Sequence, residues 1–71
     1  KEFDLIFIDF AARDYIKVLE DAISLVRING YIIADNISFE KCKDYKESIL
    51  NHPKLETQIE GDLAFSRKIN L

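Results

Sequence analysis

The sequence lacks the features that define several classes of small protein. It has one cysteine and no long apolar run among its 71 residues. A single cysteine cannot form an internal disulfide, and a membrane span is disfavoured without about 20 consecutive apolar residues. No charged and then apolar leader is present, which argues against a secretory signal. We therefore expect a cytoplasmic protein with no membrane partner.

The overall charge also argues against general binding to nucleic acid. The formal net charge is -3, so no overall basic field attracts a polyanion, although this argument leaves a local basic patch open. With 48% apolar residues the chain can build one small core, but a chain of this length buries only about 60% of its unfolded surface. Because residues 1–4 lead into a strand within three residues, we interpret the chain as a fragment of a longer protein.

The hydrophobic pattern of the first half predicts a parallel βαβ unit. Residues 5–8 are an unbroken apolar run between two aspartates, typical of a strand buried on both faces. From residue 12 to 27 apolar residues recur every three or four positions, which predicts a helix with Arg27 in its last turn and Asn29-Gly30 as its stop. Residues 31–34 form a second apolar strand, so the two strands are expected to be parallel neighbours.

A second helix and a hairpin are predicted in the second half. Cys42, Tyr45 and Ile49 are spaced as the inner face of a short helix that ends before the single proline. Residues 54–69 alternate around Gly61, the first residue of a two-residue loop, which predicts an antiparallel type II′ hairpin. Two sets of alternate residues each share a face: Leu55, Thr57 and Ile59, and Leu63, Phe65 and Ile69. The predicted fold class is α/β.

Acids follow both strands of the βαβ unit, where open α/β sheets collect their ligands. Asp9 closes the first strand and Asp35-Asn36 closes the second. Neighbouring strands lie about 4.8 Å apart, a gap that a cation with oxygen ligands at about 2.0 to 2.1 Å can bridge. Hard oxygen donors favour magnesium, with manganese or calcium as substitutes. The structural alternative is that the aspartates cap helices and that Asp-Asn is an ordinary turn pair.

Four segments in order resemble one enzyme family. They are residues 3–9 with Tyr15 and Leu19-Glu20, residues 29–36, residues 51–57 and residues 61–68. They are similar to the acidic strand and its helix, the Gly-Gly-x-Ile-x-x-Asp-Asn strand, the terminal helix end and the hairpin of the catechol and caffeoyl-CoA type O-methyltransferases. That family includes enzymes that methylate hydroxyuridine in tRNA. The resemblance implies that residues 1–71 are the C-terminal part of one Rossmann-like methyltransferase domain whose main cofactor-binding half lies upstream.

The resemblance also implies a site and a reaction. Asp9, Asp35 and Asn36 are implied to hold magnesium (or manganese or calcium), Asp9 and Phe10 to lie near the methionine part of S-adenosylmethionine, and Asn36 to face the substrate oxygen. The implied enzyme transfers a methyl group from S-adenosylmethionine to a substrate hydroxyl. Its substrate would be a small catechol-like phenol or a modified tRNA nucleoside, and the full-length protein would be a candidate homodimer. The fragment alone is expected to be inactive.

One feature of the family is missing. Many members place a lysine three residues after the first acid as the base, and here that position is Ala12. Arg13 stays protonated, so it can offer only charge or a hydrogen bond. Either the metal lowers the hydroxyl pKa enough without a protein base, or the protein is a non-catalytic methyltransferase-like domain. The catalytic base is therefore unassigned.

A third alternative is a phosphoacceptor signalling domain, because receiver domains also present an aspartate at the end of a buried strand. That interpretation expects a lysine after a later strand, and the second strand ends in Asp35-Asn36 instead.

The other polar and aromatic residues are assigned packing or surface roles. Cys42 is interpreted as a small apolar filler, and Tyr15 and Tyr45 as core residues. His52 is expected to act at a helix end, through termination or the helix dipole. Arg67-Lys68 is interpreted as a solvated strand end, with contact to an RNA backbone as the alternative if the substrate is tRNA.

Overall fold

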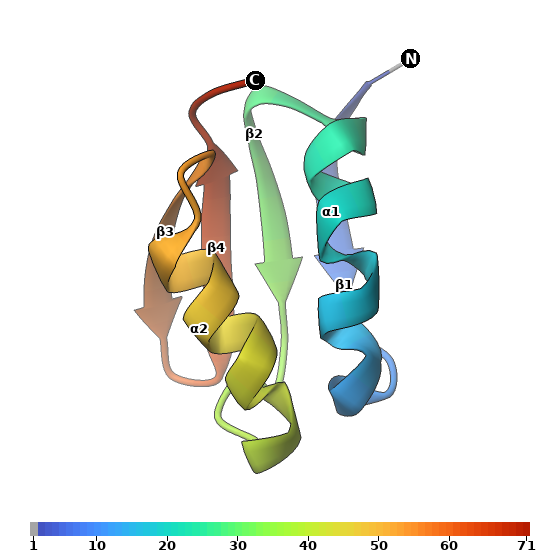
Figure 1. The fold of residues 1–71 in the computed structure, drawn as a ribbon, viewed down its shortest axis with the longest axis vertical. Helices are drawn as coiled ribbons and strands as arrows, with labels where there is room; N and C mark the ends of the chain where they lie inside the picture. The colour runs from blue at the N-terminus through green and yellow to red at the C-terminus, as the bar shows by residue number, and fades with distance from the viewer. Residues whose placement is uncertain (1) are drawn as a thin grey trace.

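The computed structural model describes residues 2–71, and Lys1, the first residue of the expected domain, lies outside the described residues. A four-stranded mixed sheet, in the order β1-β2-β4-β3, carries both α-helices on one face (Figure 1). The elements in chain order are β1 (Phe3–Ile8), the 3-10 turn η1 (Ala12–Asp14), α1 (Tyr15–Leu25), β2 (Val26–Ala34), the 3-10 turn η2 (Glu40–Cys42), α2 (Lys43–Asn51), β3 (Leu55–Glu60) and β4 (Leu63–Lys68). No helix within residues 2–71 is long and apolar enough to cross a membrane.

β1 and β2 are parallel neighbours, which confirms the predicted βαβ arrangement. The register aligns Ile6 with Ile32 and Ile8 with Ala34, so these side chains share the face that the helices cover. The apolar stripes of α1 and α2 pack onto that face and close the core. The core includes Cys42, Tyr15 and Tyr45, as predicted, and its buried members are Ile8, Tyr15, Leu19, Ala22, Ile23, Val26, Ile32, Ala34, Ile37, Cys42, Tyr45, Ile49, Leu55 and Ala64.

The other face of the sheet is open, so the prediction that the first strand is buried on both faces is wrong for the described chain. Leu5 and Phe7 of β1 are each 54% exposed, and Tyr31 of β2 is 40% exposed. Alternate residues of a strand point to opposite faces, and residues 2–71 place both helices on the same side. The apolar run predicted that both faces of β1 are covered. Residues 2–71 cover only one of them.

α1 ends at Leu25, two residues earlier than predicted. Its last bond runs from the Val26 N–H to the Ala22 carbonyl oxygen, and Val26 itself is extended, with φ -83° and ψ 144°. Because the Val26 side chain is fully buried, its packing favours the start of a strand over another helical turn. Arg27 is therefore not in a helix, and its guanidinium pairs with the Asp4 carboxylate.

Asn29-Gly30 forms an irregular segment of β2 and not the predicted helix stop. Asn29 has the expected left-handed backbone, with φ 73°, but the register of β2 against β1 shifts at this point, between Phe3 and Leu5. Such a bulge adds residues to one strand and bends it. A Cβ atom on Gly30 would lie 2.8 Å from the Asp4 carbonyl oxygen, so the close approach of the strands requires glycine.

β3 and β4 form the predicted antiparallel hairpin. Glu60 pairs with Leu63 across a two-residue loop. Gly61 has φ 59° while Asp62 has no positive φ, which is the pattern of a type II′ turn. β4 also pairs antiparallel with β2, so the hairpin completes the sheet.

The core-facing residues of β4 differ from the apolar set of the predicted hairpin. They are small or polar, and all are buried: Ala64, Ser66 and Lys68. Leu63 and Phe65 do share a face, as predicted, but it is the open face of the sheet, and Ile69 lies beyond the strand. Because α2 packs on the neighbouring strand β3, where the Thr57 hydroxyl donates to the Ile49 carbonyl oxygen, little room is left beside it, and the small side chains of Ala64 and Ser66 fit better than large ones.

The interpretation of Arg67-Lys68 as a solvated strand end is wrong for Lys68. Its side chain is buried, and its Nζ donates hydrogen bonds to the carbonyl oxygens of Ile23 and Val26, at 2.7 and 2.9 Å. An RNA contact is excluded for this ammonium group by the same burial. Arg67 is half-buried and pairs with Glu56 at 2.7 Å.

Candidate functional site

The two acids predicted to bind a metal lie at the ends of two paired parallel strands. Asp9 follows Ile8, the last residue of β1, and Asp35 follows Ala34, the last residue of β2. Ile8 and Ala34 are register partners, and the Asp35 N–H donates to the Ile8 carbonyl oxygen at 3.2 Å. The acids therefore stand on neighbouring strand ends at the carboxyl edge of the parallel pair.

The backbone turns sharply at Asn36, the third predicted ligand. Its φ is 60°, a left-handed conformation that asparagine tolerates better than most residues. Its N–H donates to Asp35 Oδ1 at 2.8 Å. The tip of the hairpin fixes the residues that follow, because the Ile37 N–H donates to the Asp62 carbonyl oxygen at 2.8 Å and the Ser38 hydroxyl donates to the Asp62 carboxylate.

Tyr15, at the start of α1, places a phenol behind this edge. Its side chain is fully buried, and its hydroxyl has no well-aligned hydrogen-bond partner among residues 2–71. Burial raises the pKa of Tyr15, and the charges of Cys42, Asp9 and Asp35 raise it further, while the Phe10 backbone opposes the shift. The Tyr15 hydroxyl therefore keeps its proton and stays neutral.

The chemistry of the donors fits a hard divalent cation. Two carboxylates and one amide supply oxygen atoms, which magnesium, manganese and calcium prefer. Asp9 is exposed, whereas Asp35 and Asn36 are half-buried, so an ion held there would be open to a substrate. Within residues 2–71 no group of three His, Cys, Asp or Glu side chains could hold a metal ion. The predicted set has only two such side chains, Asp9 and Asp35, because its third ligand, Asn36, is an amide. The metal site stays a prediction.

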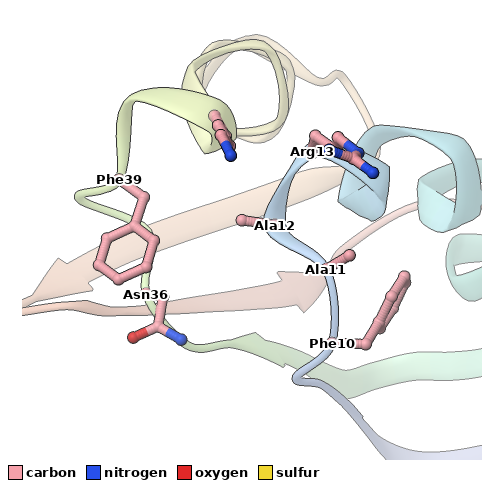
Figure 2. Close-up of a pocket in the computed structure, with 7 residues that line it drawn as sticks. Phe10, Ala11, Ala12, Arg13, Asn36 and Phe39 are labelled. Atoms are coloured by element: carbon pink, nitrogen blue, oxygen red, sulfur yellow. The ribbon is translucent and has the colours of Figure 1, made fainter.

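A pocket of about 290 Å³ opens beside Asn36 (Figure 2). Its lining consists of residues 10–13, Asn36, Phe39 and Lys41. Two predicted site residues are thus brought together: Phe10, assigned to the cofactor, and Asn36, assigned to the substrate. Asp9 and Asp35 do not line this pocket. Ala12 is in its wall, so the position of the expected lysine offers no proton acceptor.

Sequence reasoning missed part of this pocket. Arg13 is predicted to offer only charge or a hydrogen bond, and no role is predicted for Phe39 or Lys41. These residues meet because η1 packs beside η2, where the Cys42 thiol lies 3.7 Å from the Ala12 carbonyl oxygen. The one available signal is Phe39, a large apolar residue in a polar loop that proves to be 54% exposed.

A second hollow, of about 400 Å³, lies on the open face of the sheet. Its lining residues come from all four strands: Leu5, Tyr31, Ile33, Gln58, Glu60 and Phe65. No predicted site residue borders it. The hollow is larger than the pocket beside Asn36, but it is a mainly apolar surface without the converging polar groups of a ligand site.

The chain is similar in fold to solved protein structures. It matches the cofactor-bound protein Rv0187 from MTB with a TM-score of 0.85 and 22% identity, over 99% of this chain and 42% of that one. It matches a candidate O-methyltransferase from Klebsiella pneumoniae with a TM-score of 0.81 and 21% identity, over 97% of this chain and 41% of that one. At these identities the likeness shows a shared fold, and the chain spans about two fifths of the length of those proteins.

No curated protein is similar enough to the chain to match it. The family model for O-methyltransferases, however, matches residues 1–69. Because this match extends over nearly the whole sequence, the chain belongs to the O-methyltransferase family.

Proposed function

We propose that this chain is the acceptor-side part of an enzyme that transfers a methyl group from S-adenosylmethionine to a substrate hydroxyl with the help of a divalent metal ion. One observation carries the proposal. In a chain of the O-methyltransferase family, Asp9 and Asp35-Asn36 end two paired parallel strands, and Asn36 also lines a pocket. Acids, amide and pocket thus share the edge at which α/β sheets bind ligands.

In the proposed site, Asp9, Asp35 and Asn36 would hold magnesium, or manganese or calcium in its place. The bound ion would supply positive charge that stabilises the deprotonated substrate hydroxyl. Asn36 orients the substrate oxygen from the wall of the pocket.

The lining of the pocket limits how the hydroxyl proton leaves. Ala12 has no acidic or basic group, and Arg13 cannot accept a proton. Lys41, the other ionisable residue of the lining, carries its proton as a cation and has no acceptor to offer in that form. The proton would therefore pass to water at the open side of the pocket. This route suits a hydroxyl that is itself acidic, such as a phenol, better than an aliphatic alcohol.

We propose further that residues 1–71 are the C-terminal part of a single Rossmann-like domain. The matched structures are more than twice as long as this chain, and the apolar face around Leu5, Phe7 and Tyr31 is uncovered. An exposed apolar sheet face of this kind is rare unless another segment packs on it. The remaining part of the domain would cover that face and supply most of the S-adenosylmethionine site, with Asp9 and Phe10 near the methionine moiety.

The full-length protein provides the test. With magnesium present, titration with S-adenosylmethionine should release heat of binding, and methyl transfer should be seen to a panel of vicinal aromatic diols and to RNA that contains hydroxyuridine. The variant Asp35→Asn, which keeps the size of the side chain, should lose transfer while it keeps the fold. Absence of cofactor binding would end the proposal.

A non-catalytic methyltransferase-like domain is the second candidate, and Ala12 is the observation that favours it. It predicts binding of S-adenosylmethionine without methyl transfer to any member of the panel, so detectable turnover excludes it. The phosphoacceptor alternative loses its support, because the chain belongs to the O-methyltransferase family.

A further inference from the structure

Asp62, in the loop between β3 and β4, lies at the same end of the sheet as the turn that follows β2 (Figure 1). β2 and β4 pair antiparallel, and Ala34 is the register partner of Ala64. Extension of this register by two residues brings Asn36 to the position opposite Asp62. The pairing does continue past the strand ends, because the Ile37 N–H donates to the Asp62 carbonyl oxygen at 2.8 Å. The hairpin tip and the turn after β2 are therefore joined by the backbone.

The side chain of Asp62 makes a second contact with the same turn. Its carboxylate accepts a hydrogen bond from the Ser38 hydroxyl, and hydrogen bonds to a charged acceptor are stronger than those between neutral groups. One residue thus binds both residues that directly follow Asn36. The Ile37 side chain is 1% exposed, so packing in the core fixes this segment from the other side.

Asn36 depends on such support because its backbone conformation is unfavourable. Its φ is 60°, and a residue with a side chain keeps a left-handed conformation only where the surrounding structure fixes it. Two of its own hydrogen bonds are local: its N–H donates to Asp35 Oδ1 at 2.8 Å, and its carbonyl oxygen accepts from the Phe39 N–H at 3.1 Å. The bonds to Asp62 differ, because they connect the turn to another strand of the sheet.

From these contacts we infer that Asp62 is a positioning residue of the proposed site. It fixes the turn that follows Asn36, and this turn keeps the Asn36 side chain at the edge where β1 and β2 end in Asp9 and Asp35. Asp62 is not among the residues that line the pocket, so it acts through Asn36 and not by contact with the acceptor. The inference rests on the proposed function, because Asn36 is a metal ligand only in that proposal.

The side-chain contact can be removed from either end in the full-length protein. Asp62→Ala and Ser38→Ala should each weaken binding of Mn²⁺, measured by electron paramagnetic resonance of the free ion, by about tenfold, the low end for groups that orient a metal ligand. The double variant should bind no more weakly than either single variant, because both changes remove the same bond. Asp62→Asn keeps an oxygen that can accept from the Ser38 hydroxyl, so it should retain most of the affinity.

Glu60→Ala is the matched control. Glu60 is an exposed acid of the same hairpin, so its replacement removes the same charge without removing the contact with Ser38. It should bind Mn²⁺ as the parent protein does. Agreement between this control and the parent would show that a lost charge at the hairpin tip is not enough to weaken the site.

Amide hydrogen exchange provides a readout that needs neither metal nor turnover. The exchange rates of the Ile37 and Phe39 amides report how often the turn opens. In Asp62→Ala both should exchange about fivefold faster than in the parent, the effect of one lost hydrogen bond. The Ala64 amide, within β4, should exchange as before.

The outcomes separate this inference from the proposed function. If the variants weaken Mn²⁺ binding and loosen the turn while no acceptor is methylated by the parent, the positioning role stands and the transfer proposal fails. If Asp62→Ala binds Mn²⁺ as Glu60→Ala does, or leaves both amides as protected as before, the inference is wrong even where methyl transfer is seen. Equal weakening by Asp62→Asn and Asp62→Ala would also overturn it. A parent protein that binds no Mn²⁺ would overturn it together with the proposed metal site.

Discussion

The buried ammonium group of Lys68 donates a hydrogen bond to the carbonyl oxygen of Ile23, in the last turn of α1, at 2.7 Å. The same Nζ reaches the Val26 carbonyl oxygen at 2.9 Å. The last carbonyls of a helix have no partner within it and carry partial negative charge. Lys68 therefore connects β4, the last strand in the chain, to the C-terminal end of α1. This helix joins β1 to β2, the two strands that the acids follow.

Replacement of Lys68 by methionine should destabilise the full-length protein. The variant keeps an apolar stem but leaves two carbonyl oxygens without their donor, and hydrogen bonds to a charged group are worth roughly 1.5 to 3 kcal/mol. We expect the free energy of unfolding in urea to fall by about 2 kcal/mol. Lys43→Met, at an exposed position, is the control and should change little. An unchanged urea midpoint for Lys68→Met would contradict this role.

Tyr45→Phe should stabilise the protein. The Tyr45 ring packs edge-on against Tyr15, with centroids 5.6 Å apart, but its buried hydroxyl has no hydrogen-bond partner among residues 2–71. Removal of an unsatisfied buried hydroxyl should raise the free energy of unfolding by about 1 kcal/mol. A loss of stability in Tyr45→Phe would mean that the hydroxyl is bonded after all.

Stability should decrease as the pH rises above the ordinary pKa of a thiol. Burial raises the pKa of Cys42 from 9.0 in the folded protein. Above that value the unfolded chain releases the proton before the folded chain does, so the stabilisation that is complete below pH 9.0 is lost as the pH rises through the folded pKa. In reducing buffer, the free energy of unfolding should therefore fall less steeply for Cys42→Ala than for the parent protein as the pH rises from about 8 to about 10. Identical slopes would show that the thiol does not contribute.

The open face of the sheet predicts unequal effects for two phenylalanines with the same exposure. Phe7 on that face and Phe39 in the pocket are each 54% exposed. If the rest of the domain covers the face, Phe7→Ala in the full-length protein removes a core side chain and should cost about 3 kcal/mol or more. Phe39→Ala should cost less than about 1 kcal/mol. If both variants lose the same small free energy of unfolding in thermal or urea unfolding, the sheet face is not covered in the full-length protein. That result would contradict the proposed domain.

Metal binding can be measured apart from turnover. Asp35→Asn should weaken binding of Mn²⁺ by at least about tenfold, because ligands matter no less than the groups that orient them. Electron paramagnetic resonance of free Mn²⁺ gives this affinity directly in the full-length protein. Asp44→Asn, in the exposed first turn of α2, is the matched control and should bind as the parent does. Equal affinity of the two variants would remove Asp35 from the site.

Local pattern was enough to predict the parallel pair, the second helix and the hairpin. The apolar runs, the helical spacing and the glycine of the loop each reflect forces that act between near neighbours. The end of α1 was not predictable in this way, because burial of Val26 and the pairing of Arg27 with Asp4 depend on β1. The amphipathic spacing continues to Arg27, and only tertiary packing ends the helix before it.

The candidate site was predictable at its edge and not in its pocket. Asp9 and Asp35 follow strands whose parallel pairing the sequence indicates, so their neighbourhood could be inferred. Arg13 and Lys41 approach only when η1 and η2 pack together, and no short motif encodes that contact. Lys68 shows the same limit, because its charge suggests a solvated end, while its two carbonyl partners lie on other elements.

Asp62 at the hairpin tip accepts hydrogen bonds from Ile37 and Ser38, so in the proposed enzyme the tip would influence which acceptor fits beside Asn36. Insertions at such tips are usually tolerated without cost to a fold. Here a longer or shorter tip would shift the backbone beside Asn36 while both aspartates kept their places. If the proposed methyl transfer holds, changes in this surface loop could alter which molecule is accepted without changing the residues proposed for the chemistry.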